Sequence, residues 1–216
     1  MKILNPATHA LVADVAEDGA TSIRAKYARA RAAQPAWAAL PLRKRLDAIR
    51  EFRARTIAMR ETLAKTLTLE MGKPIRQSRN ELDGLLGRID FFLAEASSVL
   101  REEKVFADAK TKLEERISHE PLGVVANISA WNYPYFVGAN VFVPALIAGN
   151  AVLYKPSEYA TLTGLHIAAM LYEAGVPTDV FVPVVGSGKA GAALLRQPVD
   201  GVFFTGSNTS VGTPAS

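Results

Sequence analysis

The spacing of hydrophobic side chains divides the chain into a helical half and a half in which strands and helices alternate. From about residue 20 to residue 105, apolar residues recur at the three- and four-residue intervals of helices with one buried face. This spacing predicts three helices, over 20–40, 42–71 and 75–100. The second helix is expected to end at Gly72-Lys73-Pro74, because glycine often terminates a helix and proline cannot continue it.

From Gly123 onward, short β-branched runs replace the helical spacing. The runs predict buried strands over 124–128, 151–154, 181–185 and 202–204, with helices between them over 136–148, 162–174 and 189–195. A further extended strand is expected over 116–120. Alternating strands and helices favour right-handed crossovers and an α/β fold with a parallel sheet covered by helices. A sheet that stops at four strands is expected to leave 202–204 or a neighbour as an exposed edge.

The composition is that of an ordinary globular protein, with 216 residues, 49% hydrophobic and 21% charged. There are no cysteines, which excludes a disulfide, a thiolate metal site and a cysteine nucleophile from these residues. The three histidines have no partners at ligand spacing, so no metal site is expected. No signal peptide is recognisable, and the apolar runs are too short to span a bilayer, which favours a cytoplasmic protein without a membrane partner.

The net charge of +4 raises the question of a nucleic-acid partner. Basic side chains concentrate between residues 20 and 60, where 11 Lys and Arg accompany 2 acidic residues. They interleave with apolar residues at helical spacing, which favours a solvated helix face over a phosphate-binding surface. No nucleic-acid partner is therefore expected.

The residues that follow the predicted strands are polar or rich in glycine. They are Ser129-Ala130-Trp131-Asn132, Lys155-Pro156-Ser157-Glu158, Gly186-Ser187-Gly188 and Thr205-Gly206-Ser207. Parallel sheets bind ligands beyond the carboxyl ends of their strands, so this pattern predicts a nucleotide cleft.

Two of these segments have alternative interpretations. Gly186 to Gly191 spells G-x-G-x-x-G, but the acidic residue expected about 20 positions later is missing, which favours a tight strand–helix turn over a phosphate cradle. Lys155 and Glu158 are suited to grip the two hydroxyls of a ribose, one donating and the other accepting. A surface ion pair of little energetic value is equally compatible with their spacing.

Ordered motifs over nearly the whole chain resemble the aldehyde dehydrogenase superfamily. They are NPAT at 5–8, LEMGKP at 69–74, EPLGVV at 120–125, WNYP at 131–134, PALIAGN at 144–150, KPSE at 155–158 and FTGS at 204–207. The resemblance implies an incomplete Rossmann-like sheet with covering helices, preceded by a helical amino-terminal layer. It divides the chain into a helical part of the cofactor-binding domain (1–110), a strand arm used for oligomerisation (111–122) and the incomplete sheet (123–216).

The resemblance also assigns roles to individual residues. Asn132 matches an asparagine whose amide helps bind the oxyanion formed from the aldehyde. Lys155 and Glu158 match the pair that holds the adenosine ribose, and Gly206 with Ser207 matches the turn at the pyrophosphate. The other cofactor-binding residues that it implies are Ile128, Ala130, Trp131, Ser157 and Gly186.

By this resemblance the expected activity is NAD(P)-dependent oxidation of an aldehyde to a carboxylate. NAD is favoured because the Glu158 carboxylate repels a 2′-phosphate, although Lys155 and Ser157 are compatible with NADP. The family's cysteine nucleophile and deacylating glutamate belong to a second half that these residues do not include, so an inactive fragment of a homo-oligomeric parent is expected. The substrate class is a general aliphatic aldehyde or semialdehyde. The alternative is a catalytically dead nucleotide-binding or subunit-interaction module.

Overall fold

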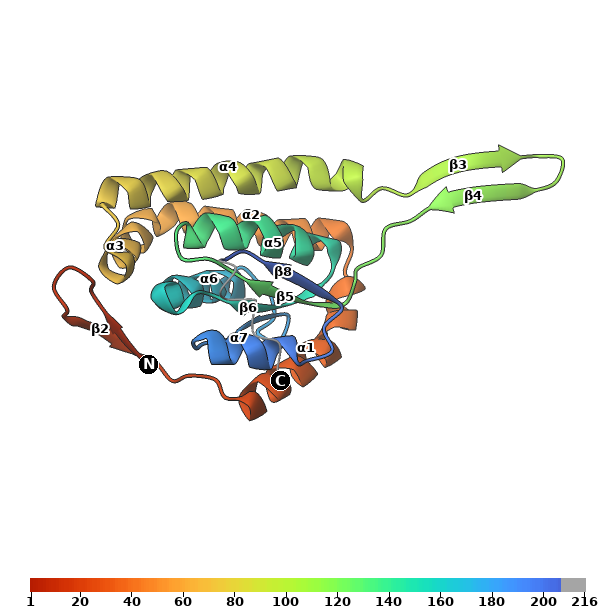
Figure 1. Cartoon of the computed structure of the whole chain (residues 1–216). Helices are drawn as coiled ribbons and strands as arrows, with labels where there is room; N and C mark the ends of the chain where they lie inside the picture. The colour runs from red at the N-terminus through yellow and green to blue at the C-terminus, as the bar shows by residue number, and fades with distance from the viewer. Residues whose placement is uncertain (207–216) are drawn as a thin grey trace.

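A four-stranded parallel sheet forms the centre of the computed structural model, which describes residues 1–206 (Figure 1). Its strands are β5 (Val124–Ile128), β6 (Ala151–Lys155), β7 (Phe181–Pro183) and β8 (Gly201–Phe204). The strand order is β7-β6-β5-β8, and every pairing is parallel. The predicted α/β fold class is therefore confirmed, and the strands lie where the β-branched runs indicated, except that β7 ends at Pro183 and not at residue 185.

Helices cover both faces of the sheet because its strands carry apolar side chains on both sides. On one face, Val125 and Val152 pack against α5 (Pro134–Ala148) and α6 (Thr161–Glu173). On the other face, Val124 and Leu153 pack against α1 (Ala20–Ala38) and α7 (Gly188–Leu195). The alternation of neighbouring residues between the two cores follows from the two-residue period of a strand.

An outer layer of helices lies on α5 and α6 (Figure 1). It consists of α2 (Leu42–Ala58), α3 (Arg60–Met71) and α4 (Ile75–Val99). The single helix predicted over 42–71 is wrong, because the chain leaves helical geometry at Met59 (φ −97°, ψ 6°). Phe52 of α2 and Leu67 of α3, on the two sides of this break, are both buried in the same core.

A cluster of aromatic rings joins the helical layers to the sheet. Phe142 of α5 lies edge-on to Phe52, Tyr154 and Phe181, with ring centroids 6.0, 5.7 and 5.3 Å apart. Edge-to-face contacts at these separations are favourable because the ring edge is positive and the ring face negative. The cluster ties α2, α5, β6 and β7 together.

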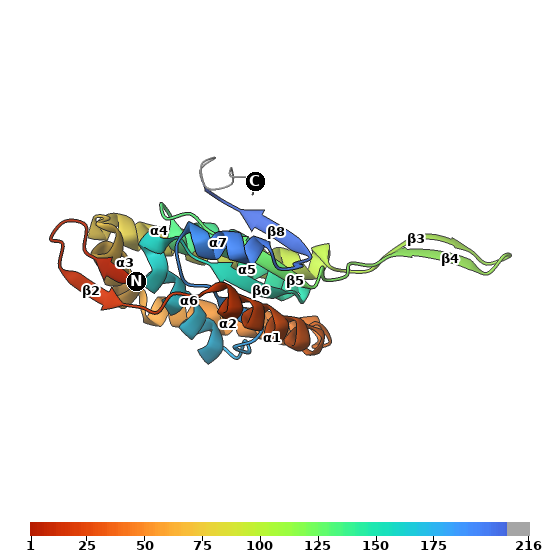
Figure 2. The same cartoon turned by 60° about the horizontal axis from the view of Figure 1, so that its bottom comes forward.

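Two antiparallel hairpins lie outside the central sheet and were not predicted as hairpins. One pairs β1 (Lys2–Leu4) with β2 (Leu11–Asp14), and the other pairs β3 (Glu103–Asp108) with β4 (Leu113–Ile117). The strand expected over 116–120 thus begins earlier, and the arm expected over 111–122 contains only the second strand of its hairpin. Almost every residue of β3 and β4 is exposed, so no burial pattern marks them in the sequence. Figures 1 and 2 show this hairpin projecting far from the rest of the chain.

Strand β8 forms an edge of the sheet, as expected for a sheet of four strands. Within residues 1–206 it pairs only with β5. Figure 2 shows β8 at the margin of the sheet. Val202 and Phe203 are 50% and 42% exposed, so part of the apolar surface of this strand faces outward. No helix in this part of the chain is both long and apolar enough to cross a membrane.

Candidate functional site

The order of strands reverses beside β5, which places the ends of β5 and β8 together. β6 and β7 follow on one side of β5, and β8 lies on its other side. The Thr205 N–H donates to the Ile128 carbonyl (3.0 Å), so the segment after β8 is joined to the end of β5. Parallel α/β sheets bind ligands where the strand order reverses. The structure thus brings the predicted residues after β5 and β8 to one place.

Lys155 and Glu158 lie at the end of the neighbouring strand β6 and within reach of each other. The Lys155 ammonium is 3.9 Å from the nearer Glu158 carboxylate oxygen and donates to the Pro156 carbonyl (3.1 Å). The Lys155 side chain is 4% exposed, whereas that of Glu158 is 37% exposed. Burial lowers the pKa of the Lys155 ammonium, and the Glu158 carboxylate opposes this effect. This half-buried pair differs from a fully solvated surface ion pair.

The G-x-G-x-x-G segment forms a tight turn between β7 and α7. Gly186 is buried with φ of 144°, and a Cβ at this position would lie 2.8 Å from the Ala190 Cβ. Both observations require glycine and agree with the strand–helix turn favoured by the sequence. Gly191 lies against the Lys155 stem, since a Cβ there would meet the Lys155 Cδ and Cε at 3.4 Å.

The remaining predicted cofactor residues differ in accessibility. Ser157 is buried, and its hydroxyl accepts from the Tyr159 N–H (3.3 Å) at the start of the short 3₁₀ helix η1 (Glu158–Ala160). Ile128 and Ala130 are half-buried, whereas Trp131 and Gly206 are exposed. Ser207 lies outside the described residues. All but one of these residues therefore lie within the described part of the chain.

Asn132 occupies the exposed turn between β5 and α5. Its Oδ1 accepts from the Tyr133 N–H (3.1 Å). Because an N–H group only donates, this contact identifies the side-chain atom as oxygen and fixes the orientation of the amide. No acceptor within residues 1–206 binds the Nδ2 group. Its two hydrogens are therefore available to a ligand with a developing negative charge.

A cavity opens beside this turn, between α4 and the start of α5. Its volume is about 480 Å³. Its lining combines aromatic rings with amide groups and one carboxylate, from Gln77, Asn80, Glu81, Gly84, Tyr133 and Phe136. A small organic molecule fits a cavity of this size and mixed chemistry.

Buried charged side chains of the α3–α4 corner (residues 70–81) support the segments that carry the candidate site residues. These charged residues were not identified from the sequence. Glu81 accepts from the Tyr135 N–H (2.8 Å) at the start of α5 and pairs with Lys73. Glu70 accepts from the Leu162 N–H (2.6 Å) at the start of α6. Burial raises the pKa of both carboxyl groups, and for Glu81 the Lys73 ammonium opposes the shift. A glutamate on the apolar stripe of a predicted helix is the signal that could have identified them.

These carboxylates occupy two helix N-termini that face the carboxyl end of the sheet. A helix N-terminus attracts anions through its free N–H groups and dipole, which is how dinucleotide-binding folds often hold a pyrophosphate. In α5 and α6 the chain's own glutamates already take this place. The N–H groups of Tyr135, Leu162 and Thr163 are therefore already bound by the protein itself.

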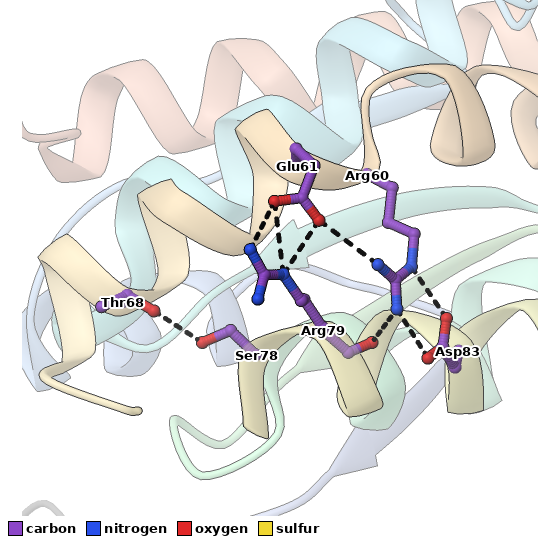
Figure 3. Close-up of polar contacts among 6 residues, drawn as sticks. All are labelled: Arg60, Glu61, Thr68, Ser78, Arg79 and Asp83. Atoms are coloured by element: carbon purple, nitrogen blue, oxygen red, sulfur yellow. Dashed lines mark hydrogen bonds and ion pairs between the residues drawn. The ribbon is translucent and has the colours of Figure 1, made fainter. Parts of the chain in front are cut away.

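Polar contacts between α3 and α4 hold the α3–α4 corner in place (Figure 3). The guanidinium of Arg60 contacts Asp83 through two nitrogens (2.8 and 2.7 Å), and Arg79 contacts Glu61 in the same way. Paired contacts of this kind are better defined than a single surface ion pair. Within residues 1–206, no cluster of three or more His, Asp or Glu side chains is arranged to hold a metal ion.

Comparison with known proteins places the chain in one family. The sequence profile described as "Aldehyde dehydrogenase family" matches residues 1–213. An N-succinylglutamate 5-semialdehyde dehydrogenase from Novosphingobium aromaticivorans is 36% identical over 83% of this chain and 38% of its own length. A protein of the same name from Caulobacter vibrioides is 36% identical over 94% of this chain and 42% of its own. The chain thus spans well under half the length of these curated relatives.

Solved structures give the same result. A glyceraldehyde-3-phosphate dehydrogenase from Methanocaldococcus jannaschii, crystallised with NADP, superposes with a TM-score of 0.90 at 25% identity, over 97% of this chain and 46% of that one. A gamma-glutamyl-gamma-aminobutyraldehyde dehydrogenase from Burkholderia cenocepacia gives 0.87 at 34% identity, over 94% and 41%. With the fold, the ordered motifs and the profile match in agreement, the chain belongs to the aldehyde dehydrogenase family.

Proposed function

We propose that these residues form the amino-terminal, cofactor-binding part of an NAD(P)-dependent enzyme that oxidises an aldehyde to a carboxylate. The observation that carries the proposal is the Asn132 amide in the turn after β5, whose Oδ1 is bound to the Tyr133 N–H and whose Nδ2 group has no acceptor within residues 1–206. The Lys155–Glu158 pair at the end of the next strand supplies a ribose-binding chemistry within the same edge of the sheet. The Asn132 amide is suited to donate to an oxyanion, and the Lys155–Glu158 pair is suited to bind the ribose of a dinucleotide.

The cofactor fits the donors and acceptors available at this edge. Within residues 1–206, the Lys155 ammonium makes one hydrogen bond, so it retains hydrogens for a ribose hydroxyl. Glu158 supplies an acceptor, and the Gly206 turn leaves the backbone exposed for a pyrophosphate. The nicotinamide, when bound, accepts the hydride from the aldehyde carbon. The role of Asn132 is to donate a hydrogen bond to the oxyanion that precedes this transfer.

The substrate class that we propose is an aliphatic aldehyde or semialdehyde. The cavity beside Asn132 is bounded by Tyr133 and Phe136, which suits an aliphatic chain, and by the amides of Gln77 and Asn80, which suit a polar end group. Several relatives are named for semialdehydes, among them the succinylglutamate semialdehyde dehydrogenases and a succinate-semialdehyde dehydrogenase [NADP(+)] of Mycobacterium ulcerans. The similarity to these relatives supports a semialdehyde as the substrate.

Cofactor preference is expected to depend on Glu158, and the adenosine halves of the cofactors test it on this chain. AMP carries a free 2′-hydroxyl, whereas 2′,5′-ADP places a phosphate against the Glu158 carboxylate. We expect AMP to bind about tenfold more tightly, because like charges in contact are unfavourable. Glu158→Gln is expected to reduce this ratio to about threefold or less. Calorimetric titration of both nucleotides measures the ratio.

Glu115→Gln is the matched control, because Glu115 lies on the distant β3–β4 hairpin and is exposed. It should leave both affinities unchanged. Lys155→Met should weaken both nucleotides by removing a ribose donor, and 2′,5′-ADP at least as much as AMP because the ammonium also attracts the 2′-phosphate. If Glu158→Gln keeps the ratio of the unsubstituted chain, Glu158 does not select the cofactor.

The β3–β4 hairpin supports a proposal about assembly, namely that a protein of the relatives' length is a homo-oligomer. Apolar side chains of the hairpin are about half exposed, at Val105, Phe106, Leu113 and Ile117. Exposed apolar strands are suited to an interface with another subunit. Light scattering on a chain extended to the relatives' length is expected to show an oligomer that deletion of 103–117 dissociates. A monomeric extended chain would contradict the proposal.

A further inference from the structure

The α3–α4 corner grips the turn after β5 at several points. The Lys73 ammonium donates to the Asn132 carbonyl (2.7 Å) and lies 4.3 Å from the centroid of the Tyr133 ring. Lys73 also pairs with Glu81, whose other carboxylate oxygen accepts from the Tyr135 N–H (2.8 Å). One ion pair thus contacts three residues of the four-residue segment 132–135.

The ion pair between Lys73 and Glu81 is largely shielded from solvent. The Lys73 side chain is 12% exposed and that of Glu81 is fully buried. Away from water, charge-assisted hydrogen bonds are strong, and removing one partner leaves an uncompensated charge. If Lys73 leaves the turn, the buried Glu81 carboxylate loses its cation, which disfavours other conformations of the turn.

Capping of α5 does not by itself account for Lys73. Glu70 caps α6 with the same chemistry, accepting from the N–H groups of Leu162 and Thr163 (2.6 and 2.9 Å). Within residues 1–206, Glu70 has no basic partner. A buried glutamate is thus sufficient to cap a crossover helix in this fold. What Lys73 adds is the contact with the Asn132 carbonyl.

We propose that Lys73 and Glu81 are positioning residues that hold the Asn132 turn, so that its Nδ2 group is presented in one orientation. Lys73 fixes the Asn132 backbone, and Glu81 fixes both Lys73 and the first turn of α5. The Asn132 Oδ1 is then held on the Tyr133 N–H, which leaves the amide nitrogen as the outward donor. This inference rests on the proposed function, in which the Asn132 amide donates a hydrogen bond to the oxyanion formed from the aldehyde.

Nuclear magnetic resonance of the 216-residue chain tests the inference without aldehyde or cofactor. The Asn132 side-chain NH₂ signals are assigned by their loss in Asn132→Ala. In Lys73→Met we expect these signals to shift and broaden, and the Tyr135 N–H to exchange with solvent about tenfold faster. The Leu171 N–H in α6 should be unaffected. Lys73→Arg, which keeps the cation, should restore most of the original spectrum.

Lys65→Met is the matched control, because Lys65 is exposed on α3, the helix that precedes Lys73. It should change none of these signals. An unchanged Asn132 signal in Lys73→Met, or faster exchange spread equally over α6 and the sheet, would overturn the inference. If Lys73→Met does not fold, Glu81→Gln decides by the same criteria. Failure of the proposed function is seen separately, as a lack of AMP binding in the unsubstituted chain.

Discussion

The 216-residue chain will reduce no NAD above the buffer blank when it is supplied with short aldehydes. The family's chemistry requires a thiolate nucleophile and a base that activates water for deacylation. The sequence contains no cysteine. Nor does a histidine activate a serine in its place, because within residues 1–206 no serine hydroxyl hydrogen-bonds to His9, His119 or His166. Asn132 by itself is a donor without an oxyanion to stabilise.

Absorbance of the reduced nicotinamide measures this outcome directly. The Caulobacter vibrioides relative, purified and assayed in parallel, is the positive control for the conditions and the aldehyde panel. Turnover by the 216-residue chain that disappears in Asn132→Ala would contradict the prediction and would reveal a nucleophile among the residues present. Turnover that persists in Asn132→Ala would instead indicate a contaminating enzyme.

Phe142→Ala is expected to lower the free energy of unfolding by about 3–5 kcal/mol. Phe142 is fully buried and its ring contacts three other aromatic rings, those of Phe52, Tyr154 and Phe181. Removing the ring loses its transfer free energy and leaves a cavity between α2, α5 and the sheet that rigid neighbours fill only in part. For a domain of ordinary stability this loss is a large fraction of the total.

Phe91→Ala is the control for the loss of a phenyl ring that is not at the centre of the core. Phe91 is 52% exposed on α4 and contacts one aromatic ring, that of Phe92. Its substitution should change the free energy of unfolding by about 0.5 kcal/mol or less. Urea titrations followed by circular dichroism give both values. A Phe142→Ala loss below about 1.5 kcal/mol would show that the aromatic cluster rearranges to fill the space.

The sequence predicted the sheet more accurately than the outer helices and hairpins, for identifiable reasons. The strands at 124–128 and 151–154 are apolar on both faces, and no other environment suits such short runs. The break at Met59 carries no proline or glycine, so only packing on the rest of the molecule reveals it. Strands β3 and β4 are exposed on both faces, so no alternation of buried and exposed positions marks them in the sequence.

Within the candidate site, sequence reasoning located the residues that follow strands and missed those that support them from elsewhere. Asn132, Lys155 and Glu158 follow predicted strands, so topology alone brings them to one edge. Lys73 and Glu81 belong to a helical layer, and their proximity to the Asn132 turn depends on how that layer packs. No local pattern determines such packing, since it is fixed by contacts between distant parts of the chain.

The position of β8 determines the order in which the cleft is assembled. β5 and β6 are separated in the chain by one helix, and β6 and β7 likewise, whereas β8 reaches β5 only after two further strands and three helices. Closing the longer loop costs more chain entropy, so β5, β6 and β7 are expected to associate before β8 joins them. A strand with one partner also opens more readily than a central one. Within the described residues, the wall of the cleft that carries Gly206 is therefore expected to be the last part of the sheet to form.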